Sequence, residues 1–127
     1  MPRTPSEAEV SALRATVRVL AADPAADLLR GDLASGARTV CQLLALRYPG
    51  GTVELRIPPV AAVQLGIGER GRHTRGTPPN VVQMDLVTLL RLAGGSLTWD
   101  DALATHSVRA SGIRADLATL WPLPELA

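Results

Sequence analysis

Arginine, histidine and hydroxyl side chains gather in one stretch of the chain, residues 69–80, between glycines and prolines. Guanidinium groups match the geometry of carboxylates and phosphates, and glycines let backbone N–H groups approach an anion. The stretch therefore indicates a binding site for an anionic head group. The alternative is a solvated loop whose arginines pair with Glu69 and Asp85. The residues that could hold the anion are Arg70, Arg72, His73 and Arg75.

The second histidine, His106, does not complete a catalytic or metal-binding set. We expect His106 and Ser107 on adjacent positions of a strand, where they would point to opposite faces, and this argues against a triad with Asp101. Asp100 and Asp101 are explained more simply as carboxylates that stabilise the start of a helix. The single cysteine, Cys41, lies on an apolar helix face and is expected to be a core residue. We therefore expect that the protein is not an enzyme and that it binds no metal and no cofactor.

Length and composition predict one folded domain over residues 1–127, with a flexible tail at residues 1–5. The net charge of +1 argues against a nucleic-acid partner. No apolar run is long enough to span a membrane, and the first residues lack the apolar region of a signal peptide, so we expect a cytoplasmic protein. All 13 basic residues are arginine, which fits a GC-rich genome of the actinobacterial type.

Helical spacing of apolar residues dominates the first third of the chain. Val10, Leu13, Val17 and Leu20 recur on one face, and Ser6 with Glu9 can form a capping box at its start. We expect helices at residues 6–22, 25–29 and 37–47, with a loop at residues 31–36.

The period then changes to the alternation of polar and apolar residues that is typical of a half-buried strand, as in Thr52–Ile57. We expect further strands at residues 61–65, 80–84 and 107–111, and helices at residues 86–93, 99–104 and 113–120. This order lacks a strict strand–helix alternation. It predicts an α+β fold with a single, mostly antiparallel sheet covered on one face by helices.

Small apolar residues on the strands offer one wall of a possible cavity. Val53 and Leu55 belong to the first strand, and Val63 belongs to the second. Trp99 and Trp121 are the only tryptophans; they are expected to pack in the core or to line a pocket, with the segment around Trp121 acting as a lid. Because the chain has no phenylalanine, the space behind the strands could stay open or be filled tightly by Leu and Val.

Several motifs after residue 52 belong together. The most specific is the run from His73 to Asn80, His-Thr-Arg-Gly-Thr-Pro-Pro-Asn. The others are Val53-Glu54-Leu55-Arg56-Ile57-Pro58-Pro59, Ala62-Val63-Gln64, Thr98-Trp99-Asp100-Asp101-Ala102 and Val108-Arg109-Ala110-Ser111-Gly112. With these motifs, the stretch from Thr52 to Leu123 resembles the actinobacterial branch of the sterol carrier protein 2-like family.

The resemblance implies a sheet of about five strands and an apolar cavity between the sheet and the helices. It also implies non-catalytic binding of a fatty acid, an acyl-CoA or a sterol, of which we expect the acyl chain. The basic residues would then hold a carboxylate or a CoA phosphate at the cavity mouth. Two alternatives stay open: an accessory domain with a filled core that binds an unknown protein partner, and a relative of thiol-linked isomerases.

Overall fold

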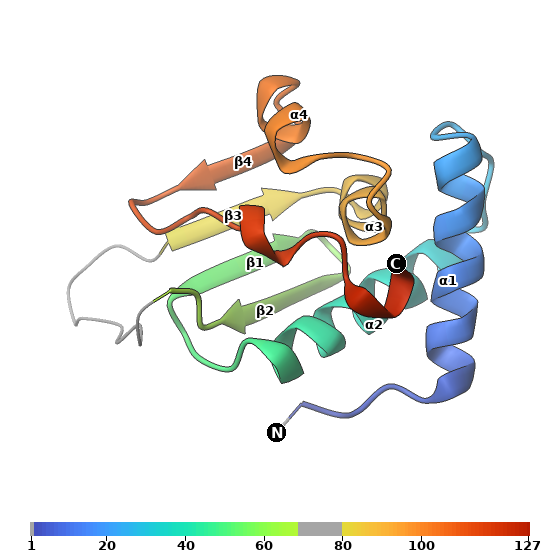
Figure 1. The fold of residues 1–127 in the computed structure, drawn as a ribbon, viewed down its shortest axis with the longest axis horizontal. Helices are drawn as coiled ribbons and strands as arrows, with labels where there is room; N and C mark the ends of the chain where they lie inside the picture. Colours follow the sequence, from blue (N-terminus) through green and yellow to red (C-terminus); the bar gives the residue numbers. More distant parts are fainter. Residues whose placement is uncertain (1, 69–79) are drawn as a thin grey trace.

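The computed structural model describes residues 2–68 and 80–127, and Figure 1 shows its fold. Its elements, in chain order, are α1 (Glu7–Ala22), α2 (Arg30–Arg47), β1 (Val53–Ile57), β2 (Ala61–Leu65), β3 (Asn80–Met84), α3 (Leu86–Gly94), α4 (Trp99–Ala104), β4 (Val108–Ser111) and the short 3₁₀ helices η1 (Ala118–Leu120) and η2 (Pro124–Leu126).

The described strands form one mixed sheet in the order β2-β1-β3-β4. β1 pairs antiparallel with β2, and β3 pairs antiparallel with β4, whereas the central pair β1 and β3 runs parallel. The α+β class is thus confirmed. The prediction of about five mostly antiparallel strands matches only roughly, because β3 returns to the edge of β1 in the same direction as β1 and the described sheet has four strands.

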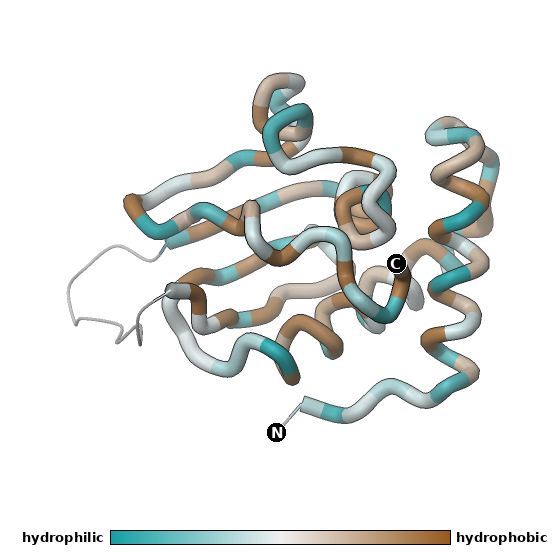
Figure 2. Tube along the Cα trace, viewed as in Figure 1, coloured by the Kyte–Doolittle hydropathy of each residue, from teal (hydrophilic) through white to brown (hydrophobic). Residues whose placement is uncertain are grey.

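Only one face of the sheet is apolar. The strand register places aliphatic side chains directly opposite one another, as with Leu55 and Val63, and Leu55 and Val82. Hydrophobic and hydrophilic positions alternate along the strands (Figure 2). The apolar face is buried beneath the rest of the chain, while the opposite face carries the polar residues Glu54, Arg56, Gln64, Gln83 and Arg109.

Three predicted elements are wrong. Residues 25–29 are not helical, and the predicted loop at residues 31–36 is part of α2. Tertiary packing overrides the low helix propensity of glycine here, because Gly36 is buried against Leu13 and Leu90. The helix predicted at residues 113–120 is also absent, since only Ala118–Leu120 is helical, as one 3₁₀ turn. There the Asp116 carboxylate accepts a bond from the Ala118 N–H, which competes with helix formation.

The helix predicted at residues 6–22 is confirmed as α1, which begins with the expected capping box of Ser6 and Glu9.

α1 packs closely against α2 and α3 at positions that are occupied by glycine, which has no side chain. A Cβ atom on Gly94 would lie 2.0 Å from the Cγ1 atom of Val17. Since Val17 is itself buried, the Val17 side chain fits only because residue 94 has none.

Gly94→Ala should therefore destabilise the protein by about 1–3 kcal/mol through overpacking, despite the better helix propensity of alanine. Val17→Ala in the same chain removes the Cγ1 atom, so the double variant should be more stable than the sum of the two single changes predicts. Urea unfolding of the four proteins measures this. Additive losses, or a fully stable Gly94→Ala protein, would contradict the packing described here.

Candidate functional site

The apolar face of the sheet is covered in part by the last sixteen residues, 112–127, which we call the C-terminal strap. The strap crosses in front of β3 and β1 and ends beside α2 and α1 (Figure 1). Leu117, Leu120 and Leu123 of the strap are almost completely buried in the same core as Leu55 and Val82. The contact between strap and sheet is therefore a layer of aliphatic side chains, which is the chemistry that an acyl chain matches.

Few polar contacts fix the end of the strap. The Leu123 N–H donates to the Ala93 carbonyl oxygen of α3 at 2.9 Å. The guanidinium group of Arg14, in α1, donates to the Glu125 carbonyl oxygen from Nη2 at 2.9 Å and from Nε at 3.3 Å. Arg47, at the end of α2, donates from Nη2 to Glu125 Oε2 at 2.8 Å. The strap end is thus tied to three helices by a handful of hydrogen bonds.

Glu125 is the charged centre of this attachment. Partial burial is the largest single influence and raises the pKa of its carboxyl group. The hydrogen bond from Arg47, the backbone N–H of Glu125 and the charge of Arg47 together lower the pKa by more, so that it lies below the ordinary value of 4.5. The Oε1 atom is buried, which contributes to this desolvation, and it has no hydrogen-bond partner among the described residues. A lowered pKa means that the ion pair stabilises the fold above pH 4.5 and loses this effect as the pH falls through the pKa of folded Glu125.

The structure brings together three of the predicted apolar site residues. Val53 and Leu55 are buried on the covered face, and half-buried Val63 lies directly opposite Leu55. Trp121 belongs to the strap and packs half-buried against the same core. Trp99 is buried at the start of α4, which lies beside β4 at the edge of the sheet farthest from β2 (Figure 1). Trp99 and Val63 therefore belong to opposite edges of the apolar layer.

The predicted basic residues Arg70, Arg72, His73 and Arg75 lie outside the described residues. Their role at a cavity mouth stays a prediction.

Several described side chains between the sheet and the helices are fully buried. Leu55, Ile57, Leu65 and Leu89 are each 0% exposed. An acyl chain that enters among these side chains must displace some of them.

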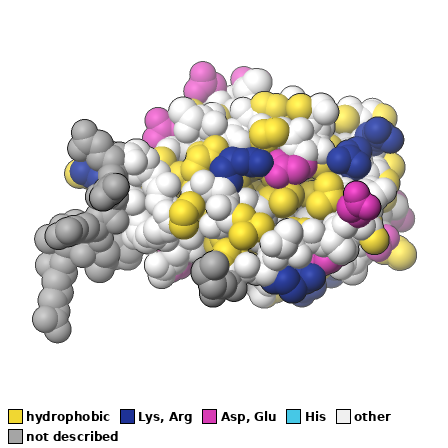
Figure 3. All heavy atoms as spheres, turned by 60° about the horizontal axis from the view of Figure 1, so that its bottom comes forward, with side chains coloured by type: hydrophobic (Ala, Val, Ile, Leu, Met, Phe, Trp, Pro, Cys, Tyr) yellow, Lys and Arg dark blue, Asp and Glu magenta, His cyan; other side chains and the backbone are white. Residues whose placement is uncertain are grey.

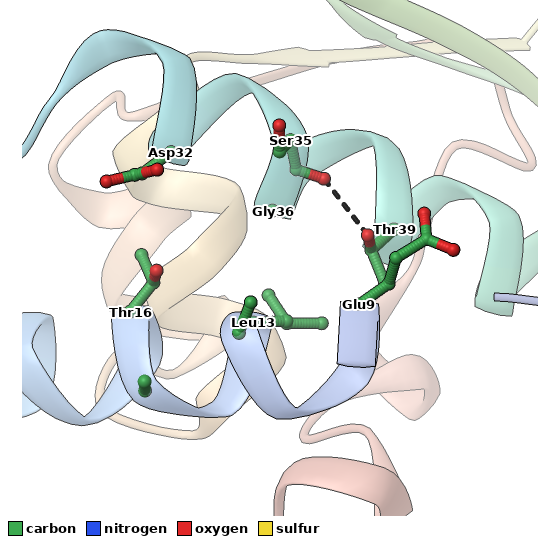
Figure 4. Close-up of a pocket in the computed structure, with 9 residues that line it drawn as sticks. Glu9, Leu13, Thr16, Asp32, Ser35, Gly36 and Thr39 are labelled. Carbon is green, nitrogen blue, oxygen red and sulfur yellow. Dashed lines mark hydrogen bonds between the residues drawn. The ribbon is translucent and has the colours of Figure 1, made fainter. Parts of the chain in front are cut away.

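A hollow of about 370 Å³ lies on the outer side of the helices, between α1 and α2 (Figure 4). Thr16 and Asp32 face each other across it, and the Thr39 hydroxyl donates to the Ser35 carbonyl oxygen at 3.0 Å. Leu13 lines this hollow and is itself buried. This mixture of hydroxyl and carboxylate groups suits a polar ligand better than an acyl chain.

The face at the bottom of Figure 1 is of mixed character. Figure 3 turns this face toward the viewer and shows hydrophobic side chains between arginine and carboxylate side chains. Such a mixture is ordinary for a protein surface.

His106 and Ser107 do not lie on adjacent strand positions, because β4 begins at Val108. The strand argument for opposite faces therefore does not apply to them, and both residues line one hollow of about 210 Å³, together with Asp85 and Arg109. His106 has a left-handed backbone (φ 58°), which differs from the extended backbone of a strand residue. The Ser107 hydroxyl pairs with the Thr105 hydroxyl at 2.9 Å rather than with His106.

Among residues 2–68 and 80–127, no group of three or more His, Cys, Asp or Glu side chains is placed to hold a metal ion. Within the same ranges, no helix is both long and apolar enough to cross a membrane.

Comparison with known protein families identifies the family to which this fold belongs. A family model described as bacterial SCP ortholog matches residues 29–123, which include the sheet, α2 to α4 and most of the strap. The chain belongs to the bacterial SCP ortholog family. The family match confirms the resemblance to sterol carrier proteins and leaves α1 outside. A search of curated proteins finds no match.

Arg14, Arg47 and Glu125 are the site residues that the sequence did not reveal. Arg47 and Glu125 are 78 positions apart and share no motif. Only their opposite charges could have indicated an ion pair, and many other pairs of charged residues in the chain have opposite charges too.

The titration of Glu125 tests this attachment. In the wild-type protein, we expect the pKa of Glu125 to lie below 4.5, as measured by carboxyl ¹³C NMR. Arg47→Ala removes the hydrogen bond but leaves the desolvation, so the pKa of Glu125 should rise. Arg38→Ala is the matched control, because Arg38 is exposed on the same helix. A pKa of Glu125 that is the same in all three proteins would show that Arg47 does not hold the strap.

Proposed function

We propose that this protein binds the acyl chain of a lipid, without catalysis, in the aliphatic layer beneath the C-terminal strap. The observation that carries the proposal is the cover itself: three buried leucines, on a strap with only two short 3₁₀ turns, share one core with the aliphatic side chains of the sheet. Membership of the bacterial SCP ortholog family supports the proposal.

Binding requires that the strap leucines give up their places to the ligand. Exposing a buried leucine costs about 1.5–3 kcal/mol, and burying one methylene group gains about 0.8 kcal/mol. About eight buried methylene groups of a fatty acid would therefore offset the exposure of Leu117, Leu120 and Leu123. The chain of palmitate is long enough for this exchange.

The strap is the cover that can open most readily. A segment with few hydrogen bonds opens at a lower free energy than a regular element. The helices and strands are held by continuous backbone hydrogen bonding, whereas the strap end depends on Leu123, Arg14 and the Arg47–Glu125 pair.

In this proposal, the carboxylate or CoA phosphate of the ligand is bound by Arg70, Arg72, His73 and Arg75. The double variant Arg72→Ala with Arg75→Ala should therefore lose more affinity for anionic lipids than for neutral lipids.

A second candidate function is that of an accessory domain that binds a protein partner. The complete burial of Leu55, Ile57 and Leu65 favours it, because a domain that only presents its surface needs no opening.

Palmitate binding to the wild-type protein and to Arg47→Ala distinguishes the two candidates. The partly exposed Arg47–Glu125 pair contributes about 0.2–1 kcal/mol, so its loss should increase the open population and the association rate by a factor of about 1.4 to 5. Arg38→Ala should bind at the wild-type rate. Stopped-flow fluorescence gives the rates, and native mass spectrometry gives the stoichiometry, which we expect to be one acyl chain per protein.

Cys41 provides a second readout of opening. Burial raises the pKa of its thiol to about 12, so the folded protein should react very slowly with a disulfide reagent at pH 8. Arg47→Ala should accelerate the reaction, and Arg38→Ala should not.

If neither the wild-type protein nor Arg47→Ala binds palmitate, the acyl-carrier function is wrong and the accessory-domain function takes its place.

A further inference from the structure

The hollow of about 210 Å³ that holds His106 lies where the two parallel strands of the sheet end. β1 and β3 run side by side toward the same end of the molecule (Figure 1). Pro58, directly after β1, lines the hollow together with Met84 and Asp85 at the end of β3. From β1 the chain turns to β2 on one side, and from β3 it continues through α3 and α4 to β4 on the other side. In open sheets, ligands often bind at such a switch point, beyond the carboxyl ends of parallel strands.

The register of the sheet brings the polar side chains of the hollow together. Gln83 of β3 is paired with Arg109 of β4, so their Cβ atoms lie about 5 Å apart on the polar face of the sheet. Asp85 and Ser107, each two positions further along the chain toward this end, line the same hollow. The hollow therefore belongs to the polar face and not to the apolar layer beneath the strap.

His106 has the least ordinary backbone among the residues that line the hollow. It is the one residue other than glycine with a left-handed φ in the part of the chain that the structure describes. The His106 N–H donates to the Leu103 carbonyl oxygen at 3.1 Å, and the next N–H, of Ser107, donates to the Ala102 carbonyl oxygen at 2.9 Å. These two bonds form a helix-ending motif in which this position is usually glycine. Glycine would hold the same backbone with less strain, so the end of α4 does not by itself explain an imidazole here.

The charged groups of the hollow are not paired with one another. No ion pair between described residues includes Arg109 or His106. The carboxylate of Asp85 lines the same hollow as Arg109, and its Oδ1 atom accepts from the Thr88 N–H at 2.8 Å. Its other oxygen can accept a further hydrogen bond. The hollow thus presents a guanidinium group and a carboxylate that are close together but not in contact.

We propose that this hollow binds a small zwitterion, which carries a phosphate or carboxylate group and a protonated amine. The guanidinium group of Arg109 matches the geometry of either oxyanion, and His106 and Ser107 donate to the same group. The ammonium group of the ligand donates to Asp85. Asp85 repels an anion that has no amine, and Arg109 repels a cation that has no acid group, so the two charges together select a ligand that carries both.

The size of the hollow agrees with a small ligand. Sites for drug-sized molecules have about 300–1,000 Å³, whereas this hollow has about 210 Å³. The site lies on the face of the sheet opposite the acyl layer, so the inference goes beyond the proposed function and does not rest on it.

Titration followed by ¹H–¹⁵N NMR tests the inference, with the amides of Ser107 and Arg109 as reporters. The probes are O-phosphoethanolamine and β-alanine, which carry both charges, and inorganic phosphate and ethanolamine, which carry charge of one sign. At least one zwitterion should bind the wild-type protein more tightly than either single-sign probe does. The tighter zwitterion identifies the oxyanion as phosphate or carboxylate.

Asp85→Asn tests the carboxylate without removing the helix cap, because asparagine caps a helix about as well as aspartate. This variant should bind the tighter zwitterion about two- to fivefold more weakly, yet it should bind inorganic phosphate more tightly than the wild type does. Arg109→Ala should weaken the zwitterion about tenfold. Arg38→Ala is the matched control, since Arg38 is an exposed arginine of α2, and it should bind like the wild type.

His106→Gly separates a role in binding from a role in folding. The variant should unfold at the wild-type temperature or above it, because glycine suits a left-handed φ, and it should still bind the zwitterion several-fold more weakly.

A wild-type protein that shows no saturable shift with either zwitterion would overturn the inference, as would wild-type affinity in Asp85→Asn, Arg109→Ala or His106→Gly. Palmitate binding should be unchanged in all three variants. Loss of zwitterion binding with intact palmitate binding supports a separate site, and a wild-type protein that binds the zwitterion but not palmitate contradicts the acyl-carrier function alone.

Discussion

A sheet with one aliphatic face must keep that face out of water, and the cover of this face determines what the protein can do. The register of β1 with β2 and β3 aligns Leu55, Val63 and Val82 on the same side. Helices and the C-terminal strap share the cover, and the opposite face remains polar. A regular helix and an irregular strap differ in how readily they open, because a segment that is held by few hydrogen bonds opens at a lower free energy than a regular element.

The two ends of the strap have different physical character. Its start is held by amide and backbone hydrogen bonds of Asn80, which do not titrate. Its end is held by the charged pair of Arg47 and Glu125. The apolar side chains between these ends provide most of the stabilisation, whereas the polar contacts determine where the chain enters and leaves the layer. An acyl ligand would compete with the leucines and not with the polar groups.

The sequence predicted the elements whose periodicity is strong. Helix α1, with its Ser6 cap, and strands β1 to β3 follow from spacing alone. The early start of α2 did not, because burial of Gly36 against Leu13 and Leu90 depends on helices distant in sequence. The parallel pairing of β1 with β3 and the long-range Arg47–Glu125 contact have no local signal. The apolar residues Val53, Leu55 and Val63 could be assigned to one face by alternation, but alternation does not show whether that face is open or covered.

Hydrogen–deuterium exchange of residues 112–127 in the presence and absence of palmitate tests the central claim most directly, which is that an acyl chain replaces the strap. The account predicts that bound palmitate makes the amides of the strap, including the Leu123 N–H that donates to Ala93, exchange faster, while β1 and β3 stay protected. A palmitate complex in which the strap is as protected as in the free protein would contradict the account.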